Sequence, residues 1–511
     1  MPDKEVTAQE LAKHSTKEDC WITIHGNVYD ITSFIEDHPG GEKILLKYAG
    51  KDATEEFDEI HSPDIPTKYL DESQQLGPLK TEPTSAPSAE SISGVVEQKL
   101  LGRELTAVEM RRRLKMEERP ALGEVLSLHD FEGIAREVME PRGWAYYSSG
   151  ADDEVTMREN HMAYGRVFFR PRILRDVTEV DYSTTILGQK SSMPIYITAT
   201  ALGKLGHPEG EKNLTRAGGK HGVIQMIPTL ASCSFDEIVD AAIPGQVQFM
   251  QLYVNKDREK TKKIVQHAES RGIKGLFITV DAPQLGRREK DMRQKFDNSE
   301  GASVQRSDSV EQNQGAARAI SSFIDPGLSW KDMAFFREIT KMPLILKGVQ
   351  TWEDAVMAAE AGLDGVVLSN HGGRQLDSSR SGLEVLVEVV RELKKRKLFP
   401  NPKFEIMIDG GIRRASDVLK AVALGATSVG IGRPLLYAYS AYGQEGVEHA
   451  FQLLKDEFEM NMRLLGARSI EEVVPEMVDA SALTQHNSSP RDEKFASTYE
   501  RLQPSTLRAK L

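Results

Sequence analysis

The segment PLILKGVQTWEDAVMAAEAGLDGVVLSNHGGRQLD, residues 343–377, holds a short apolar run, a helical stretch and a second short apolar run. Each apolar run has the length of a buried strand and ends in polar or glycine residues. The helical stretch TWEDAVMAAEAG lies between them. Two strands joined through a helix are parallel, so the segment predicts a strand–helix–strand unit of an α/β fold.

The same alternation continues on both sides of this unit. Helical stretches such as CSFDEIVDAAI and REKTKKIVQHAESRG separate most of the apolar runs. The eight runs lie at residues 194–200, 222–227, 247–254, 275–282, 343–348, 365–370, 404–411 and 428–433. Eight alternating strands and helices predict a (β/α)8 TIM barrel. A doubly wound parallel sheet is the alternative, and the eightfold count with polar residues at nearly every strand end favours the barrel.

Composition divides the chain into four parts. Residues 81–103 are rich in Pro, Ser, Thr and Glu, as an exposed linker is. They separate a compact N-terminal unit, residues 1–80, from the barrel unit, residues 104–475. Within the barrel unit, the polar stretch 291–322 is expected to be a mobile loop over the barrel mouth. The polar tail 476–511 cannot form a core of its own.

The charge of the chain is unevenly distributed. Residues 1–80 hold 17 acidic residues, 8 lysines and no arginine, so they carry −9 of the net charge of −12. This argues against nucleic acid or an anionic membrane as a partner and favours a basic protein. Every apolar run is well short of the ~18 residues of a membrane span, so no membrane insertion is expected. Cys20 and Cys233 are too few for a disulfide framework or a metal cluster.

A histidine motif dominates the N-terminal unit. His38 precedes Pro-Gly-Gly in FIEDHPGGEKILLKYAG, and His61 follows in EFDEIHSP. An isolated histidine is usually a surface or capping residue, but apolar residues flank both of these. Two such histidines could clamp a flat apolar ligand, and two axial imidazoles would leave a haem iron able only to pass electrons. A strand at 21–31 and a helix at 42–50 are expected around the motif.

The stretch DCWITIHGNVYDITSFIEDHPGG resembles the cytochrome b5 fold, a small α+β haem domain, over about residues 5–80. The likeness includes the HPGG motif and the strand and turn before it. It implies that haem b is a cofactor and that its iron is ligated by His38 and His61.

In the barrel unit, polar side chains follow several of the predicted strands. SNHGGRQLD, residues 369–377, supplies His371 as a general base and Arg374 as a fork for a carboxylate. Because the carboxyl ends of barrel strands form one mouth, we expect these residues to meet others there. The others are Gln251, Tyr253, Thr279, Asp281 and Lys347.

The last two predicted strands end in the glycine-rich turns DGGIRR, residues 409–414, and GIGRP, residues 430–434. Exposed backbone N–H groups with an arginine after each turn are typical of a phosphate site in a barrel. Lys347, at the end of the fifth strand, suits the electron-rich edge of a flavin ring. Together the two turns predict a phosphorylated ligand.

From WAYYSSGADDE, residues 144–154, to GIGRP, the chain resembles the FMN-dependent 2-hydroxy-acid dehydrogenase/oxidase family, over about residues 125–475. The likeness implies that His371 removes the substrate α-proton, that Asp281 stabilises the imidazolium and that Tyr253 binds the substrate hydroxyl. It implies that the carboxylate is held by Arg374, Tyr146 and Arg288. It also implies that FMN contacts Thr198, Ala199, Thr200, Ala201, Gln251, Thr279, Lys347, Asp409, Gly410, Gly411, Ile412, Arg413, Gly432 and Arg433.

The pairing of these two domains resembles the fungal L-lactate:cytochrome c oxidoreductases. It implies oxidation of L-lactate to pyruvate, with electrons passing singly through haem b to cytochrome c, in a homotetramer held partly by the tail. Ala201 and Leu230 line the side-chain pocket in this family, and the bulk of Leu230 favours lactate over an aryl substrate. The alternatives are a broader 2-hydroxy-acid oxidase that uses oxygen, with a vestigial haem domain, and a non-enzymatic haem protein.

Two further expectations follow from the resemblance. Pro228 stands where lactate-type relatives usually carry Ser, so this chain lacks one donor toward FMN. The resemblance also implies the mitochondrial intermembrane space, reached by a cleavable presequence. Residues 1–14 show no targeting pattern, and a cytoplasmic form is expected if Met1 is the native start.

Overall fold

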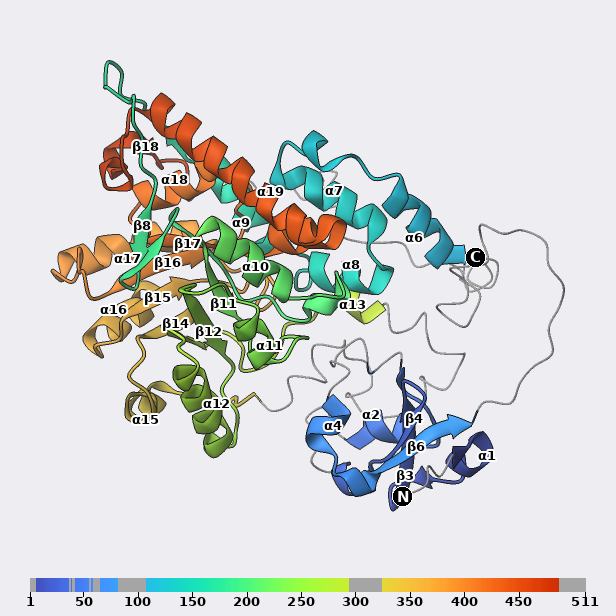
Figure 1. The fold of residues 1–511 in the computed structure, drawn as a ribbon. Helices are drawn as coiled ribbons and strands as arrows, with labels where there is room; N and C mark the ends of the chain where they lie inside the picture. Colours follow the sequence, from blue (N-terminus) through green and yellow to red (C-terminus); the bar gives the residue numbers. More distant parts are fainter. Residues whose placement is uncertain are drawn as a thin grey trace.

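The structure is a computed structural model that describes residues 6–35, 38, 42–54, 57, 65–80, 107–293 and 324–486. Figure 1 shows a small N-terminal unit built on a sheet and a large α/β unit in which helices surround a central barrel.

The large unit is a closed barrel of eight parallel strands, each paired with the next in sequence and the last paired with the first. Both the barrel and all eight predicted strands are confirmed. The doubly wound sheet is excluded because β10 pairs with β17 and leaves no edge. The strands are β10 (Ile195–Ile197), β11 (Ile224–Ile227), β12 (Gln248–Leu252), β13 (Leu276–Thr279), β14 (Leu344–Val349), β15 (Gly365–Leu368), β16 (Glu405–Asp409) and β17 (Ser428–Ile431).

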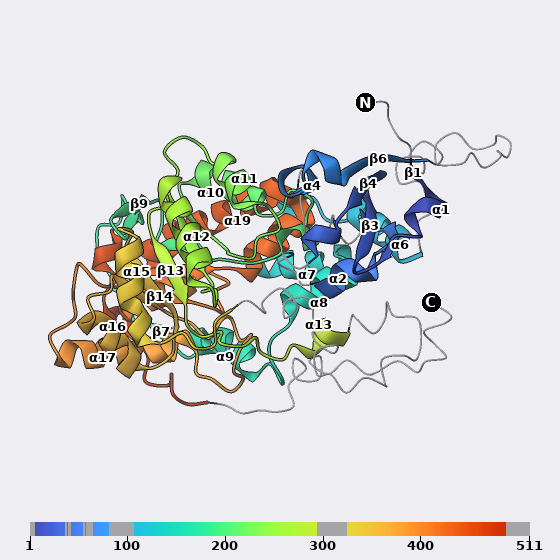
Figure 2. The ribbon, with the colours of Figure 1, turned by 90° about the horizontal axis from the view of Figure 1, so that it is seen from below.

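Helices follow the strands and cover the barrel, as Figures 1 and 2 show. Several begin where the sequence supplies a cap: Ser234, Thr351 and Ser381 each accept a hydrogen bond from the backbone three residues on. The helices are α10 (Lys212–His221), α11 (Phe235–Asp240), α12 (Arg258–Ser270), α15 (Met333–Ile339), α16 (Trp352–Glu360), α17 (Gly382–Lys395), α18 (Ala415–Ala423) and α19 (Arg433–Leu465).

Large side chains from seven consecutive barrel strands fill the barrel interior: Tyr196, Met226, Phe249, Phe277, Ile345, Val367 and Met407. The hairpin of β8 (Thr184–Ile186) and β9 (Gln189–Ser191) adds the buried Ile186 to this cluster. Leu187 at its tip donates a 2.6 Å backbone hydrogen bond to Glu405, at the start of β16. The hairpin therefore closes the amino end of the barrel and leaves the carboxyl end for the functional site.

Helices that precede the barrel pack on its outside: α6 (Ala107–Glu117), α7 (Leu128–Val138), α8 (Pro141–Ser148) and α9 (Val155–Gly165). The described part of the tail also packs on the barrel unit. Its strand β18 (Val478–Asp479) pairs antiparallel with β7 (Phe168–Phe169), and Leu483 is buried in the main core. In the predicted loop 291–322, the first three residues belong to helix α13 (Glu289–Arg293). The rest of that loop lies outside the described residues.

The N-terminal unit contains the sheet β1-β6-β4-β3-β2, with β5 beside β3. The single strand expected at 21–31 is wrong. Its residues form β3 and β4, because His25 and Gly26 both have positive φ, 51° and 74°, as a tight hairpin turn requires. The elements are β1 (Val6–Thr7), α1 (Ala8–Leu11), β2 (Ser15–Thr16), β3 (Asp19–Ile24), β4 (Asn27–Asp30), α2 (Glu42–Lys47), β5 (Lys51–Asp52), α4 (Ile65–Tyr69) and β6 (Gln75–Lys80).

Two expectations from composition agree with the fold. Cys20 and Cys233 are both free and buried, each in the core of a different unit. Within the described part of the chain, no helix combines the length and the apolar character needed to cross a membrane.

We predict that Phe131→Ala lowers the free energy of unfolding of the barrel unit by about 3–5 kcal/mol. Phe131 on α7 is fully buried, and its ring lies 6.0 Å from that of Tyr442 in α19. Chemical denaturation of the FMN-loaded protein measures the change. The control is Phe168→Ala, because Phe168 is 66% exposed and its loss should cost far less. Equal losses for the two variants would contradict the packing described here.

Candidate active site

The predicted barrel residues gather around one pocket at the carboxyl end of the strands. All of those named for substrate or FMN line it except Asp281, which lies directly behind His371. The strand register explains part of this convergence, because it pairs Thr279 with Lys347 and Asp409 with Gly430. Pro228 and Leu230 also line the pocket, as expected.

The centre of the pocket is a line of three side chains from three strand ends. His371 Nδ1 lies 3.0 Å from Asp281 Oδ1, and His371 Nε2 lies 3.0 Å from the Tyr253 hydroxyl. Because a carboxylate only accepts, Nδ1 carries the hydrogen and Nε2 accepts from Tyr253. The Asp281 carboxylate thus fixes both the orientation and the tautomer of the imidazole.

The electrostatics of this pair suit a base. Burial lowers the pKa of His371, and the neighbouring Asp281 carboxylate partly opposes that shift. Burial would raise the pKa of Asp281, but the attraction of His371 holds it below its ordinary value. The pair therefore rests as a neutral imidazole beside a buried carboxylate.

Room for Asp281 comes from a glycine at the end of β14. Gly348 has a φ of +109°, and a Cβ added there would lie 2.5 Å from Asp281 Cγ. Any side chain at this position would push the carboxylate away from His371. The glycine that follows Lys347 is therefore part of the site, although the sequence alone gives it no chemistry.

The base itself stands on a strained turn. His371, Gly372 and Gly373 have φ values of 60°, 65° and 74°, three left-handed residues in succession. A left-handed conformation costs a residue with a side chain roughly 1–2 kcal/mol. The His371 N–H donates to Ser369 Oγ at 3.0 Å, which helps to hold the turn. The imidazole thus points into the pocket because surrounding contacts impose an unfavourable backbone.

One side of the pocket carries two guanidinium groups. Arg374 lies 4.8 Å over the Tyr146 ring and donates to the Tyr146 carbonyl at 2.7 Å. Arg288 is 5% exposed, and burial together with the charge of Arg374 lowers its pKa to about 10. Two cations held this close attract an anion, and a carboxylate matches their planar donors.

The opposite wall holds a buried lysine. Lys347 Nζ lies 3.1 Å from Asp409 Oδ2 and 3.2 Å from Ser369 Oγ. Burial alone would lower the pKa of Lys347, but Asp409 and Asp281 raise it, so the ammonium stays charged. Nearby, Gln251 Nε2 donates to Thr279 Oγ1 at 2.8 Å. This wall offers a fixed cation and side-chain amide and hydroxyl groups to a polar ring edge.

The phosphate turns match the predicted ligand. Gly411 has a φ of +83°, and a Cβ there would lie 2.0 Å from the Asn160 carbonyl oxygen, so only glycine allows this close approach. Arg433 donates to the carbonyls of Tyr147, Gly372 and Ser149. Among the described residues, the buried Thr200 Oγ1 in the pocket wall has no protein partner. Glycine turns, two arginines and an unused hydroxyl fit FMN in this pocket.

A second cavity, of about 540 Å³, shares the phosphate turns with the first. The two cavities have Gly372, Gly411, Arg413 and Arg433 in common. Its other basic side chains are His129, Arg136, Arg158, His161 and Lys290. Because it adjoins the phosphate turns and is rich in cations, we treat it as the outer side of the same site.

The N-terminal unit supports only part of the haem prediction. His38 is half-buried, and its ring lies 5.8 Å from that of Phe34. Leu45, Leu46 and Phe57 are half-buried against the core of the unit, so apolar surface is available for a flat ligand. His61 lies outside the described residues, so the pairing of the two histidines stays a prediction.

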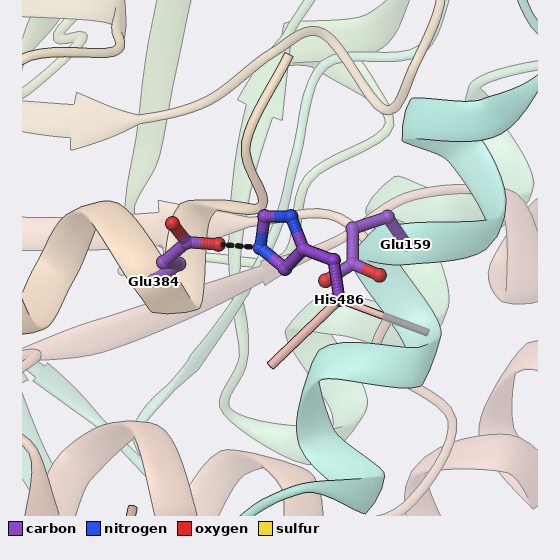
Figure 3. Close-up of side chains that lie close together, drawn as sticks. All are labelled: Glu159, Glu384 and His486. Atoms are coloured by element: carbon purple, nitrogen blue, oxygen red, sulfur yellow. Dashed lines mark hydrogen bonds and ion pairs between the residues drawn. The ribbon is translucent and has the colours of Figure 1, made fainter. Parts of the chain in front are cut away.

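A cluster formed by Glu159, Glu384 and His486, shown in Figure 3, is not apparent from the sequence. One ligand atom from each lies within 4.8 Å of the others. However, His486 is 2.6 Å from Glu384, and Glu159 forms an ion pair with Arg166. The carboxylates thus have protein partners, and the contact of His486 with α17 fastens the described end of the tail to the barrel unit.

Sequence reasoning missed several pocket residues. Gly430 and Ile431 lie in the quoted GIGRP motif, and Tyr147 is next to Tyr146, so these motifs could have indicated all three residues. Leu285, Pro434 and Leu436 complete the wall, and Asn160 touches both catalytic turns from helix α9. Asn160 is one of several polar residues in α9, and only the tertiary packing distinguishes it.

Comparison with known proteins gives a consistent result. Residues 135–480 match the family FMN-dependent dehydrogenase, and residues 7–80 match the cytochrome b5-like heme/steroid binding domain. L-lactate dehydrogenase (cytochrome) of Wickerhamomyces anomalus is 54% identical over 99% of this chain and 85% of that protein. The protein of the same name from Saccharomyces cerevisiae is 47% identical over 98% and 84%. The solved flavin-binding domain of baker's yeast flavocytochrome b2 has a TM-score of 0.70 and 49% identity, over 78% of this chain and 98% of that one.

Proposed function

The chain belongs to the FMN-dependent dehydrogenase family and carries a cytochrome b5-like domain before it, and on that premise we propose that it oxidises L-lactate to pyruvate and passes the electrons singly through haem b to cytochrome c. Both resemblances in the sequence are confirmed, and with them FMN and haem as cofactors. The observation that carries the proposal is the Tyr253–His371–Asp281 line beside the guanidinium groups of the buried Arg288 and the half-buried Arg374. The near full-length relatives named for lactate and cytochrome support it.

We assign substrate binding to the guanidinium side of the pocket. Arg374 and Arg288 hold the carboxylate, and Tyr146, over which Arg374 stacks, supports them. Tyr253 then lies where its hydroxyl can bind that of the substrate. This orientation places C2 of the substrate within reach of His371 Nε2.

The chemical step in this proposal is a proton transfer to His371 Nε2. The buried Asp281 carboxylate stabilises the imidazolium that results, because it lies 3.0 Å from the ring N–H. FMN would be held along its ring by Thr198 to Ala201, Gln251, Thr279 and Lys347, and at its phosphate by Asp409 to Arg413, Gly432 and Arg433. It would supply the acceptor for the two electrons and the remaining proton from the substrate. Haem b, held by His38 and His61, would supply one-electron transfer.

The oxygen-using oxidase remains the alternative function. It lacks the support that the full-length relatives give to the cytochrome reaction, because those relatives match both domains of this chain. We further propose that the domains are residues 1–80, 81–103, 104–475 and 476–511. We also propose that the protein is a homotetramer and that it is located in the mitochondrial intermembrane space. The acidic N-terminal unit supports a basic partner such as cytochrome c.

The function is tested by following flavin and haem absorbance together after anaerobic addition of L-lactate. We expect both to be reduced in the purified protein, and cytochrome c to be reduced in turn. In His38→Ala, lactate should still bleach the flavin and reduce ferricyanide, while haem and cytochrome c reduction are lost. The matched control is His25→Asn, an exposed histidine of the same unit.

Added salt should slow the reduction of cytochrome c but not the reduction of the flavin, since only the first depends on encounter between opposite charges. Rapid reaction with oxygen and none with cytochrome c would instead establish the oxidase.

We predict that Asp281→Asn lowers kcat by about 10²-fold or more and moves the acid limb of the kcat/KM profile to lower pH. The base must be neutral, so the rate falls as the pH drops through the pKa of His371. Asp281 raises that pKa against the effect of burial, and removing its charge lowers it further. Asp176→Asn, at an exposed carboxylate bonded only locally to Thr178, is the control. A shift of the acid limb upward would contradict the assignment.

We predict that Leu230→Ala raises the kcat/KM for mandelate relative to L-lactate by about tenfold or more, since pockets discriminate by roughly 1–3 kcal/mol at this scale. Leu230 lines the pocket together with Ala201. The two substrates are compared in the same assay. Leu376→Ala, at a leucine 75% exposed, should leave the ratio unchanged. An unaltered ratio in Leu230→Ala would mean that another residue limits the pocket.

A further inference from the structure

A pair of buried amides joins the two turns on which the active site is built. Asn160 lies on α9 and Asn370 directly precedes His371, and each is 2% exposed. Asn160 Nδ2 donates to Asn370 Oδ1 at 2.8 Å, and Asn370 Nδ2 donates back to Asn160 Oδ1 at 2.7 Å. A reciprocal amide pair of this kind fixes two side chains at once, because breaking it leaves buried polar groups unpaired.

Asn370, one member of the pair, stabilises the turn that carries His371. Asn370 Oδ1 also accepts from the Gly373 N–H at 3.0 Å, and Asn370 Nδ2 donates to the Arg380 carbonyl at 2.9 Å. These bonds join Asn370, which precedes His371, to Gly373 and Arg380, which follow it. A strained backbone persists only where its surroundings hold it, and this amide is the contact that closes the turn.

On the other side, the same helix touches the phosphate turn. The Asn160 carbonyl oxygen packs against Gly411, and His161 Nδ1 lies 2.8 Å from the Gly411 carbonyl oxygen. The carbonyl oxygen of a backbone can only accept, so His161 donates through this nitrogen. Helix α9 therefore contacts the turn after β16 and the turn after β15 with adjacent residues.

We propose that Asn160 and Asn370 are positioning residues that hold the His371 turn in register with the Gly410–Gly411 turn, and so keep the base at the correct place relative to the bound flavin. The proposal rests on the proposed function, since it concerns the geometry of that reaction. Neither amide lines the pocket that holds Tyr253 and His371, although Asn160 lines the adjoining outer cavity. Their effect passes through the backbone of the two turns.

The proposal is tested with Asn160→Ala and with the near-isosteric Asn160→Asp, which replaces the Nδ2 donor by a carboxylate oxygen facing Asn370 Oδ1. We expect kcat for L-lactate, counted per bound FMN, to fall about tenfold or more, while KM changes less than about threefold. The kinetic isotope effect with 2-deuterated lactate should increase, because a misplaced base makes C–H cleavage more limiting. Combining Asn160→Ala with Asn370→Ala should cost no more than the worse single variant, because both remove one pair.

A second readout does not depend on turnover. Backbone hydrogen exchange should speed up at residues 369–374 and 409–413 in Asn160→Ala, in both turns together. The matched control is Asn213→Ala, at another amide 2% exposed, which bonds to His207 and Gly210 around the start of helix α10. It should lower the thermal midpoint but leave kcat and both turns unchanged.

Several results would overturn the proposal. One is a variant that keeps kcat per bound FMN within about twofold of the parent protein. Another is loss of FMN with unchanged turnover of the loaded fraction, which would assign the pair to cofactor retention. Exchange that rises in one turn alone would also refute the coupling. If lactate does not reduce the flavin of the parent protein, the proposed function is wrong. Hydrogen exchange would still test whether the amide pair couples the two turns.

Discussion

The contact between Asp281 and His371 is the constraint around which the barrel mouth is arranged. A buried carboxylate is costly unless it is paired, and here its partner is an imidazole only 3.0 Å away. To make that contact, the chain must place an aspartate two residues after β13, leave space at Gly348 and turn His371 inward through a left-handed backbone. Each of these features is unfavourable or unusual by itself, and each is explained by the same pair.

The fold supplies the rigidity that such a pair requires. The β8–β9 hairpin and the aromatic interior close the amino end, so the strands cannot shift to relieve strain at the other end. Residues at neighbouring strand ends are then fixed by register, as Thr279 and Lys347 are. The side chains of the site come from strands far apart in sequence, and the barrel fixes the spacing of the strand ends that carry them.

The sequence predicts the parts of this arrangement that follow from periodicity or from local chemistry. The eight strands are visible as apolar runs, and His371, Arg374 and the glycine turns stand at their ends. It fails where long-range packing decides. The hairpin at His25 depends on a turn hidden in an apolar stretch, and Asn160 gains its role only from the approach of α9 to the turns that follow β15 and β16. The role of Gly348 likewise appears only when Asp281 is seen beside it.

Charge gives the pocket a further property. Arg288 and Arg433 both have pKa values lowered to about 10, first by burial and then by the nearby guanidinium of Arg374. Their charged forms are therefore disfavoured in the folded protein, mainly by burial and further by repulsion from Arg374. A substrate carboxylate and a flavin phosphate are anions, and both would relieve this repulsion where they bind. Because a ligand that binds only the folded state stabilises it by about 2.7 kcal/mol at a hundred times its Kd, the cation-rich mouth couples the stability of the barrel to its occupancy.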